Sequence, residues 1–487
     1  MIESFKKIEN VFIPYHENNL ALVDIIFHGH ITEVIKKISR PVEWKDIATQ
    51  SEKTKFINSL NLLPEKSNIP VQDGNYHLLI PGSIDPHVHF NTPGFEFRED
   101  FEHGSLAAAA GGVTTVIDMP CTSIPPVTND ENFRIKQNAV KNRSMIDYAF
   151  WGGIRKQDFS DLSLLEHIVV DLINKGVAGF KAYFLSGMDS FQDLNYEEMR
   201  KVAFILHKYN KILAIHAEDK NLVNSRTELY KSENKNSWKD YCNARDVSAE
   251  LVAVDNCIKI CKETGCKVHV VHLSSKDALN KIRYARFEEE VIITTETCPH
   301  YLHFTQNDFN NTAISNYLKT APPVKNEEDK EALWQGLAEG SIDFVTTDHA
   351  GCNPETEKTG SNFWNIYGGI PGVQHRVPFM LSEGFLKGRL TLQRTCELLV
   401  CGPANFFNIP QKDGIKKGNF ADFVLIDLWN SKKINAKEMH SKGQYTPFDG
   451  LELNCVIDST YLRGVKIYDP STDISPNYGF GNFIPIN

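Results

Sequence analysis

The chain has 487 residues, of which 41% are hydrophobic and 23% are charged, and its formal net charge is -10 at pH 7. This acidic balance provides no basic footprint for nucleic acid, and the sequence has no apolar run long enough to span a membrane. The ten cysteines form no CxxC pair and the N-terminus has no apolar signal core, so we expect a reducing, cytoplasmic location.

Both ends of the chain have the composition of short β-strands. In the first eighty residues, β-branched and aromatic side chains alternate with polar turns at 7–14, 20–27 and 31–35. The same pattern of β-branched and aromatic residues occurs near the C-terminus at 420–426, 455–457 and 464–468. We therefore predict one small β-sandwich built from both terminal segments, 1–80 and 410–487, beside a central domain at 81–409.

The central domain alternates predicted strands and helices. The strands are expected at 84–90, 113–119, 146–152, 178–184, 212–217, 267–273, 291–297 and 344–347. Helices are expected at 101–110, 129–141, 162–175, 196–209, 247–264, 276–286, 329–340 and 391–400, and the charged segment 220–240 reads as a surface excursion. This alternation predicts an α/β fold, a parallel (β/α)₈ TIM barrel. An open doubly wound sheet is the alternative, and the lack of a GxGxxG opening disfavours it.

Two histidines end the first strand of the predicted barrel. His87 and His89 are two residues apart, so in a strand both side chains point to one face, as two ligands of one cation must. An HxH pair alone is equally compatible with a structural role. Other metal-capable residues, however, end four further strands: Lys181, His216, His272 and Asp348. Functional residues of a barrel gather at these strand ends, so the set predicts a divalent metal site, for zinc or else manganese or cobalt.

Lys181 is the unusual member of this set. It lies within an apolar strand, where a charged amine pays a desolvation cost unless it is neutralised or paired. Carboxylation by carbon dioxide would turn it into an anionic ligand able to bridge two cations. The alternative is a lysine whose ammonium group reaches the solvent at the rim.

The order HxH, Lys, His, His, Asp resembles the binuclear cyclic amidohydrolases, which comprise dihydroorotases, hydantoinases (dihydropyrimidinases) and allantoinases. The resemblance extends nearly end to end and includes the segments 81–90, 107–120, 296–302, 321–323 and 445–448. It implies that His87 and His89 bind the more buried metal, that His216 and His272 bind the second, that carboxylated Lys181 bridges the two, and that Asp348 binds the first.

The resemblance also implies a mechanism, which is metal-assisted hydrolysis of a ring amide. Two cations would activate a water molecule, and Asp348 would pass its proton to the leaving ring nitrogen. Relatives of this kind are usually dimers or tetramers, so a homo-oligomer is expected. Some relatives of dihydropyrimidinase are non-enzymatic scaffolds without metal ligands, but here every ligand position is filled.

Residues around the metals indicate which ring is the substrate. Dihydroorotases bind the substrate carboxylate with an arginine and an asparagine, and Asn91 and Cys121 stand at those positions here. Hydantoinases have a tyrosine where this chain has Ser186. Allantoinases are more similar, especially at 119–126 and 150–153, so we predict that a neutral cyclic ureide, allantoin, is opened to allantoate.

Dihydroorotase remains the alternative, because the segments 93–100 and 348–358 look more like that enzyme. Hydantoinase or dihydropyrimidinase activity is the less favoured choice. Substrate contacts are expected from Asn91, Ser186, His300 and Gly372. His300 could equally be an ordinary rim histidine, and a glycine-rich turn such as the one containing Gly372 needs no function.

Overall fold

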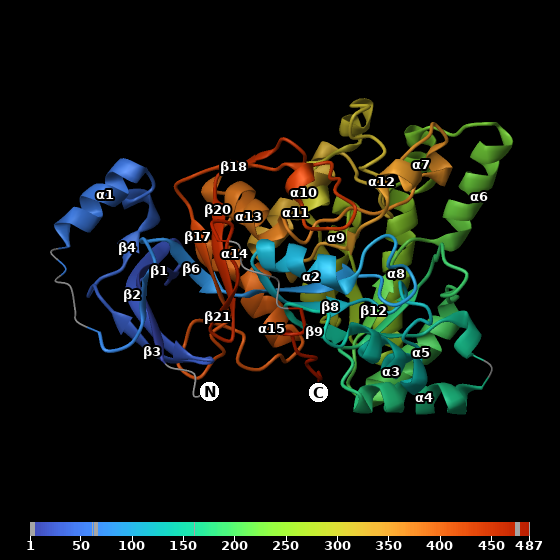
Figure 1. Cartoon of the computed structure of the whole chain (residues 1–487). Coiled ribbons are helices and arrows are strands. Elements are labelled where there is room, and N and C mark those ends of the chain that lie inside the picture. Colours follow the sequence, from blue (N-terminus) through green and yellow to red (C-terminus); the bar gives the residue numbers. More distant parts are fainter. Residues whose placement is uncertain (1–4, 61, 63–66, 160, 473–477, 487) are drawn as a thin grey trace.

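The computed structural model of the chain describes all residues except 1–4, 61, 63–66, 160, 473–477 and 487. Both terminal segments contribute to one nine-stranded sheet, in the order β21-β20-β17-β6-β1-β2-β3, with β4 on β2 and β5 on β1 (Figure 1). Its strands are β1 (Lys6–Pro14), β2 (Asn19–His28), β3 (His30–Lys36), β4 (Val42–Glu43), β5 (Val71–Asp73), β6 (Leu78–Pro81), β17 (Phe423–Asp427), β20 (Val456–Leu462) and β21 (Val465–Tyr468).

Strand β6 joins the two ends of the chain. It pairs with β1 through Leu78 on one edge and antiparallel with β17 along the other. Its side chains alternate between two apolar cores, because Leu78 and Ile80 belong to the largest cluster of buried side chains and Leu79 to a separate one. Burial on both faces explains why this stretch of sequence is uniformly apolar.

The terminal segment also contains a helix, α1 (Gln50–Ser59), where the sequence predicted only strands. Thr49 begins it with a capping box: the Glu52 N–H donates to the Thr49 hydroxyl at 3.3 Å, and the Glu52 carboxylate accepts from the Thr49 N–H at 3.0 Å. Lys53 is the one residue of α1 that is buried, so the helix has no apolar stripe for a sequence reading to detect.

The central domain contains two described parallel sheets, of order β10-β11-β12-β13-β14-β15 and β16-β7-β8-β9. Their strands are β7 (Ser83–His89), β8 (Val113–Asp118), β9 (Asp147–Phe150), β10 (Gly152–Gly153), β11 (Phe180–Tyr183), β12 (Leu213–His216), β13 (Val268–Val270), β14 (Ile293–Thr297), β15 (Phe344–Val345) and β16 (His349–Ala350). One residue separates β9 from β10, and three separate β15 from β16, so the chain connects the two sheets twice.

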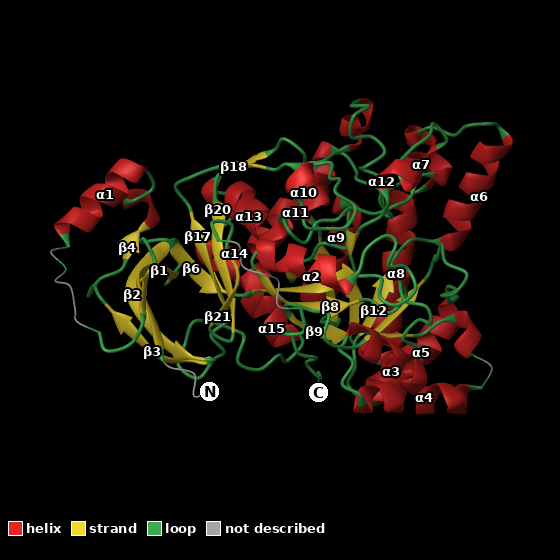
Figure 2. Ribbon diagram, in the orientation of Figure 1, coloured by secondary structure: helices red, strands yellow, loops and turns green. Residues whose placement is uncertain are grey.

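Helices follow most of these strands and lie outside them (Figure 2). They are α2 (Phe101–Ala110), α3 (Asp130–Val140), α4 (Leu162–Asn174), α5 (Tyr196–Lys208), α8 (Val247–Thr264), α9 (Lys276–Phe287) and α11 (Glu327–Glu339). Shorter helices are α10 (Pro299–His303), α12 (Pro354–Glu357), α13 (Arg376–Phe379), α14 (Leu392–Cys396) and α15 (Gly402–Phe406), and π-helical turns continue α13 and α14. No helix among the described residues combines the length and apolar character needed to cross a bilayer.

The charged segment 220–240, expected as a surface excursion, is largely helical. It forms helix α6 (Lys220–Ser232) and the start of α7 (Trp238–Ala244), each begun by a side-chain cap, from Asp219 and Ser237. Both helices project at one end of the molecule (Figure 1). The charged composition therefore reflects solvated helix faces.

The last described residues return to the central domain. The Tyr148 N–H of β9 donates to the Asn482 carbonyl at 2.9 Å, and the Ile484 N–H donates to the Tyr148 carbonyl at 2.7 Å. The Ile486 N–H donates to the Gly176 carbonyl, so this segment lies against the parallel strands and not on the nine-stranded sheet.

Candidate metal centre

Three of the predicted ligands meet at one point. His87 and His89 lie on the same face of β7, and their Nε2 atoms are 3.1 and 3.0 Å from Asp348 Oδ1. One ligand atom from each of the three residues lies within 4.8 Å of the other two. Two imidazoles and a carboxylate at this spacing form a donor set suited to a divalent cation.

Asp348 reaches this point from the break between β15 and β16. Its backbone is left-handed, with φ 47°, which redirects the chain at the strand end. Burial alone would raise the pKa of its carboxyl group, but the neighbouring His87 and His89 hold that pKa well below its ordinary value. The carboxylate is therefore ionised and able to act as a ligand or a base.

A second imidazole pair lies beside the first cluster. His216 ends β12 and His272 follows β13, and His216 Nδ1 is 3.0 Å from His272 Nε2. The His272 ring centroid is 5.6 Å from that of His87, which places the two groups side by side. The buried Nδ1 of His272 has no hydrogen-bond partner within the described residues.

Lys181 projects from β11 into the same region, and its side chain is 0% exposed. This burial excludes the alternative in which the Lys181 ammonium group reaches solvent at the rim. Its Nζ atom has no hydrogen-bond partner among the described residues and lies 4.7 Å from the Tyr183 ring centroid. Burial lowers the pKa of this amine to about 8. An unpaired buried amine is costly, so the position fits a modified side chain better than a free one.

Outer hydrogen-bond partners orient the histidines of the first cluster. Glu296 Oε1 lies 2.5 Å from His87 Nδ1, while its other oxygen is 3.2 Å from His269 Nε2. Thr122 Oγ1 is 3.1 Å from His89 Nδ1. Because these contacts occupy the Nδ1 atoms, the Nε2 atoms are left to face Asp348.

Glu218 has the corresponding role for the second pair. Its Oε2 lies 2.8 Å from His216 Nε2 and accepts from Arg245 at 2.5 Å. The sequence reading missed this residue as well as Glu296 and Thr122. Two signals were available, since Glu218 is two residues after His216 and Glu296 begins the family-like segment 296–302.

A cavity of about 650 Å³ is lined by the four histidines of the two clusters and by Asp348. Two basic groups in its wall are already engaged, because Arg245 pairs with Glu218 and Lys319 donates to main-chain carbonyls. Other lining residues are Cys121, Tyr183, Tyr241, Trp364, Ile366, Tyr367, Gly368 and Gly369. The wall also contains a third basic side chain, Lys231, whose Nζ atom lies 5.5 Å from the Trp364 ring centroid.

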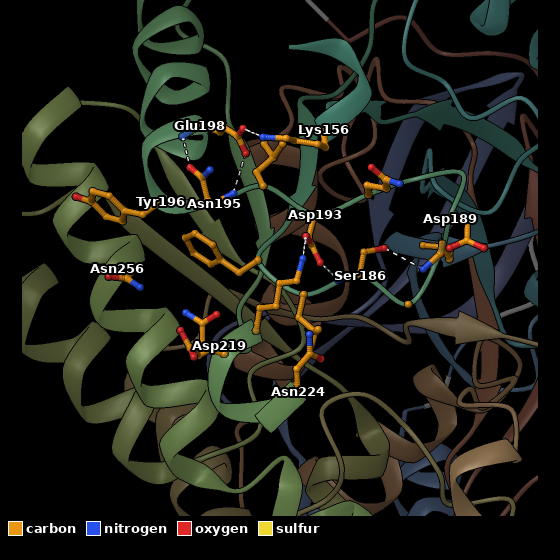
Figure 3. Close-up of a pocket in the computed structure, with 18 residues that line it drawn as sticks. Lys156, Ser186, Asp189, Asp193, Asn195, Tyr196, Glu198, Asp219, Asn224 and Asn256 are labelled. Atoms are coloured by element: carbon orange, nitrogen blue, oxygen red, sulfur yellow. Dashed lines mark hydrogen bonds and ion pairs between the residues drawn. The ribbon is translucent and has the colours of Figure 1, made fainter. Parts of the chain in front are cut away.

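Of the four predicted substrate contacts, Ser186 alone belongs to the lining of this cavity. Its hydroxyl donates to the Phe191 carbonyl at 2.6 Å and accepts from the Met188 N–H at 3.1 Å, so it is used within its own turn. Ser186 also borders a second cavity of about 680 Å³, drawn in Figure 3. Charged residues there pair with each other, as Asp193 does with Lys220 at 2.6 Å.

The other three predicted contacts, Asn91, His300 and Gly372, are buried and do not belong to the lining of this cavity. Asn91 is 1% exposed and has a left-handed backbone, with φ 58°. The His300 ring centroid is 4.2 Å from that of Tyr301, and burial lowers the pKa of His300 to about 4. Gly372 lies next to Thr347. Asn91 Nδ2 and His300 Nε2 have no hydrogen-bond partner among the described residues, so contacts from these side chains to a substrate stay a prediction.

The chain matches a family model described as the amidohydrolase family over residues 78–467. An allantoinase of Deinococcus radiodurans is 36% identical over 395 residues, which cover 80% of this chain and 84% of that protein. An allantoinase of Bacillus licheniformis is 33% identical over 425 residues, covering 85% and 90%. The solved structure of L-hydantoinase (dihydropyrimidinase) from Arthrobacter aurescens superimposes with a TM-score of 0.86 at 26% identity, covering 100% of both chains. The resemblance read from the sequence is thereby confirmed, and the chain belongs to the amidohydrolase family.

Proposed function

We propose that this chain is a metal-dependent hydrolase that opens the ring of allantoin to give allantoate. The observation that carries the proposal is the convergence of His87, His89, Asp348 and the second imidazole pair on one cavity. The buried Lys181 lies next to Tyr183 of the same cavity wall. The similar allantoinases over most of the chain support the choice of ring.

The scaffold for this site is inferred to be a closed (β/α)₈ barrel at 81–409. Pairing of β16 with β7 supports closure, because β16 follows β15 after three residues and so brings the chain from the end of the six-stranded sheet back to the first strand of the four-stranded one. The segments 1–80 and 410–487 are assigned to a flanking β-sandwich, which the two apolar cores on opposite faces of the nine-stranded sheet support.

The donor set suits two divalent cations, zinc first and manganese or cobalt as alternatives. His87, His89 and Asp348 would hold one, His216 and His272 the other, and carboxylated Lys181 would bridge them. The unpartnered Nζ of Lys181 supports this assignment, since an uncharged amine is the form that reacts with carbon dioxide. When bound, such ions lower the pKa of a water molecule and polarise the scissile carbonyl.

The chain's own residues would move the proton and exclude competing substrates. The ionised Asp348 carboxylate takes the proton from the attacking water and delivers it to the ring nitrogen as the C–N bond breaks. Glu296 and Glu218 keep the imidazoles in place. Because Arg245 and Lys319 are already engaged, two of the three lysine and arginine side chains in the wall are not available to pair with a substrate carboxylate.

Metal analysis and a substrate panel test the proposal together. We expect about two divalent ions per chain and rapid hydrolysis of allantoin, compared with dihydroorotate, hydantoin and dihydrouracil. Chelation should abolish activity and added zinc should restore it. Rapid hydrolysis of dihydroorotate with none of allantoin would favour the dihydroorotase alternative, and full activity without metal would exclude the mechanism. Light scattering on the same sample tests the expected homo-oligomer, a dimer or tetramer.

Replacing Glu296 with glutamine is expected to weaken metal binding about 10- to 100-fold, because the amide no longer fixes the His87 ring as a carboxylate does. Titration with a competing chelator measures the effect. Glu250→Gln is the matched control, since Glu250 is also buried but accepts from Ser274 and not from an imidazole. Equal metal affinity in both variants would contradict the role of Glu296.

A further inference from the structure

Lys319 is a buried lysine in the wall of the catalytic cavity. It is 5% exposed, and no carboxylate in the described part of the chain lies within ion-pair distance of it. Its Nζ atom instead donates to three main-chain carbonyls, those of Phe363 at 2.6 Å, Trp364 at 3.1 Å and Ile366 at 2.6 Å. The ammonium group also lies 4.7 Å from the Tyr241 ring centroid.

Three N–H donors of an ammonium group match three carbonyl acceptors. None of these carbonyls accepts a main-chain N–H within the described residues, so each depends on Lys319 for its hydrogen bond. Carbonyl oxygens and an aromatic face replace the water that a buried cation loses. Burial lowers the pKa of Lys319 to about 7, so the ammonium form with three N–H donors predominates below that pH.

The segment bound in this way forms part of the cavity. Trp364, Ile366 and Tyr367 line it, followed by two glycines of the same segment. The main chain of Lys319 adds a second tie, because its carbonyl accepts from the Gly369 N–H at 2.9 Å. Lys319 therefore holds residues 363–369 at both ends of the stretch that faces the substrate.

We propose that Lys319 is a positioning residue for the ring substrate, acting through residues 363–369, whose conformation its three carbonyl contacts fix. The proposal rests on the proposed function, since the substrate is the ring hydrolysed in this cavity. It predicts that losing the amine changes substrate affinity more than the chemical step, because Lys319 contacts neither the candidate metal ligands nor Asp348 through any hydrogen bond in the described structure.

Lys319→Met tests the proposal in the metal-loaded protein by two measurements. In hydrogen exchange, the amides of 363–369 should exchange about tenfold faster or more, since hydrogen bonds to a charged group are lost. In kinetics, the KM for allantoin should rise about tenfold while kcat stays within about threefold. Unchanged exchange in 363–369, or a fall in kcat at constant KM, would overturn the proposal.

Lys53→Met is the matched control. Lys53 is also a 5% exposed lysine that donates to a main-chain carbonyl, that of Asn75 at 3.2 Å, and lies over an aromatic ring, that of Trp429. It belongs to the nine-stranded-sheet region, so exchange at 363–369 and the KM should match the wild type. A control that loosens 363–369 as much as Lys319→Met does would show a general loss of stability and overturn the assignment.

Lys319→Arg keeps the test decisive if Lys319→Met is not recovered folded. A guanidinium group retains the charge but spreads its donors over a plane, so exchange and KM should lie between wild type and Lys319→Met. Values identical to wild type would contradict the proposal. Hydrogen exchange needs no substrate, so the two proposals can fail separately. If the wild type hydrolyses none of the rings but residues 363–369 exchange faster in Lys319→Met, the proposed function is refuted while the role of Lys319 in fixing this segment is supported.

Discussion

Replacing Asp348 with asparagine is expected to lower kcat for allantoin by about 10³-fold or more, with much of the metal retained. The amide preserves the volume of the side chain and one oxygen near His87 and His89, but it cannot accept the proton from water. Steady-state kinetics and metal content should be measured on the same sample, so that loss of the base is separated from loss of the ion.

Asp343→Asn is the matched control for that variant. Asp343 immediately precedes β15, pairs with Arg286 at 2.8 Å and accepts from the Thr295 N–H at 2.9 Å, away from the cavity. The Asp343→Asn variant is expected to lose some stability, but its kcat should remain close to that of the wild type. Full activity in Asp348→Asn, or a loss explained entirely by missing metal, would contradict the role of Asp348 as the acid and base.

Removing the Lys181 side chain is expected to be equally severe. Lys181→Ala should lose about 10³-fold or more in activity and bind fewer ions than the wild type, because the ligand expected between the two cations is gone. Short carboxylic acids added to the variant should restore part of both properties, since the truncated side chain leaves space for a carboxylate. Metal analysis and kinetics with and without acetate or propionate measure the effect.

Native mass spectrometry examines the modification itself. Wild-type protein should be heavier than its sequence by one carboxyl group, and Lys181→Ala should not be. Burial lowers the pKa of Lys181 to about 8, so the uncharged fraction of the amine grows as the pH rises through that value, and reconstitution with bicarbonate and zinc should be faster at higher pH. Lys53→Ala, which also removes a buried lysine, should keep the added mass and the metal. An unmodified, fully active wild type would exclude the bridge.

The clustering of His87, His89 and Asp348 could be predicted from the sequence because strand geometry imposes it. Residues two apart on a strand share a face, and the ends of parallel strands meet at one edge, so His87, His89 and Asp348 could be brought together before any coordinates existed. The helix α1 could not be found in this way, since it buries little and is specified by the capping contacts of Thr49.

The substrate contacts depended on information that a linear pattern lacks. Asn91 and His300 follow strand ends in the sequence, and both are buried outside the cavity lining, so their contacts with a substrate stay predictions. Lys319 lines the cavity, and its ammonium group donates to the carbonyls of Phe363 and Ile366. Such a contact joins segments more than forty residues apart, and local sequence periodicity carries no sign of it.

The position of β6 between β1 and β17 has a consequence for synthesis of the chain. A ribosome produces β6 early but releases β17 only after all the parallel strands, so the apolar edge of Leu78–Pro81 stays unpaired during most of translation. The nine-stranded sheet is thus completed last, after the central domain can have folded. A fragment that stops before Phe423 would keep this edge open permanently, and it would be prone to edge-to-edge aggregation in the cell.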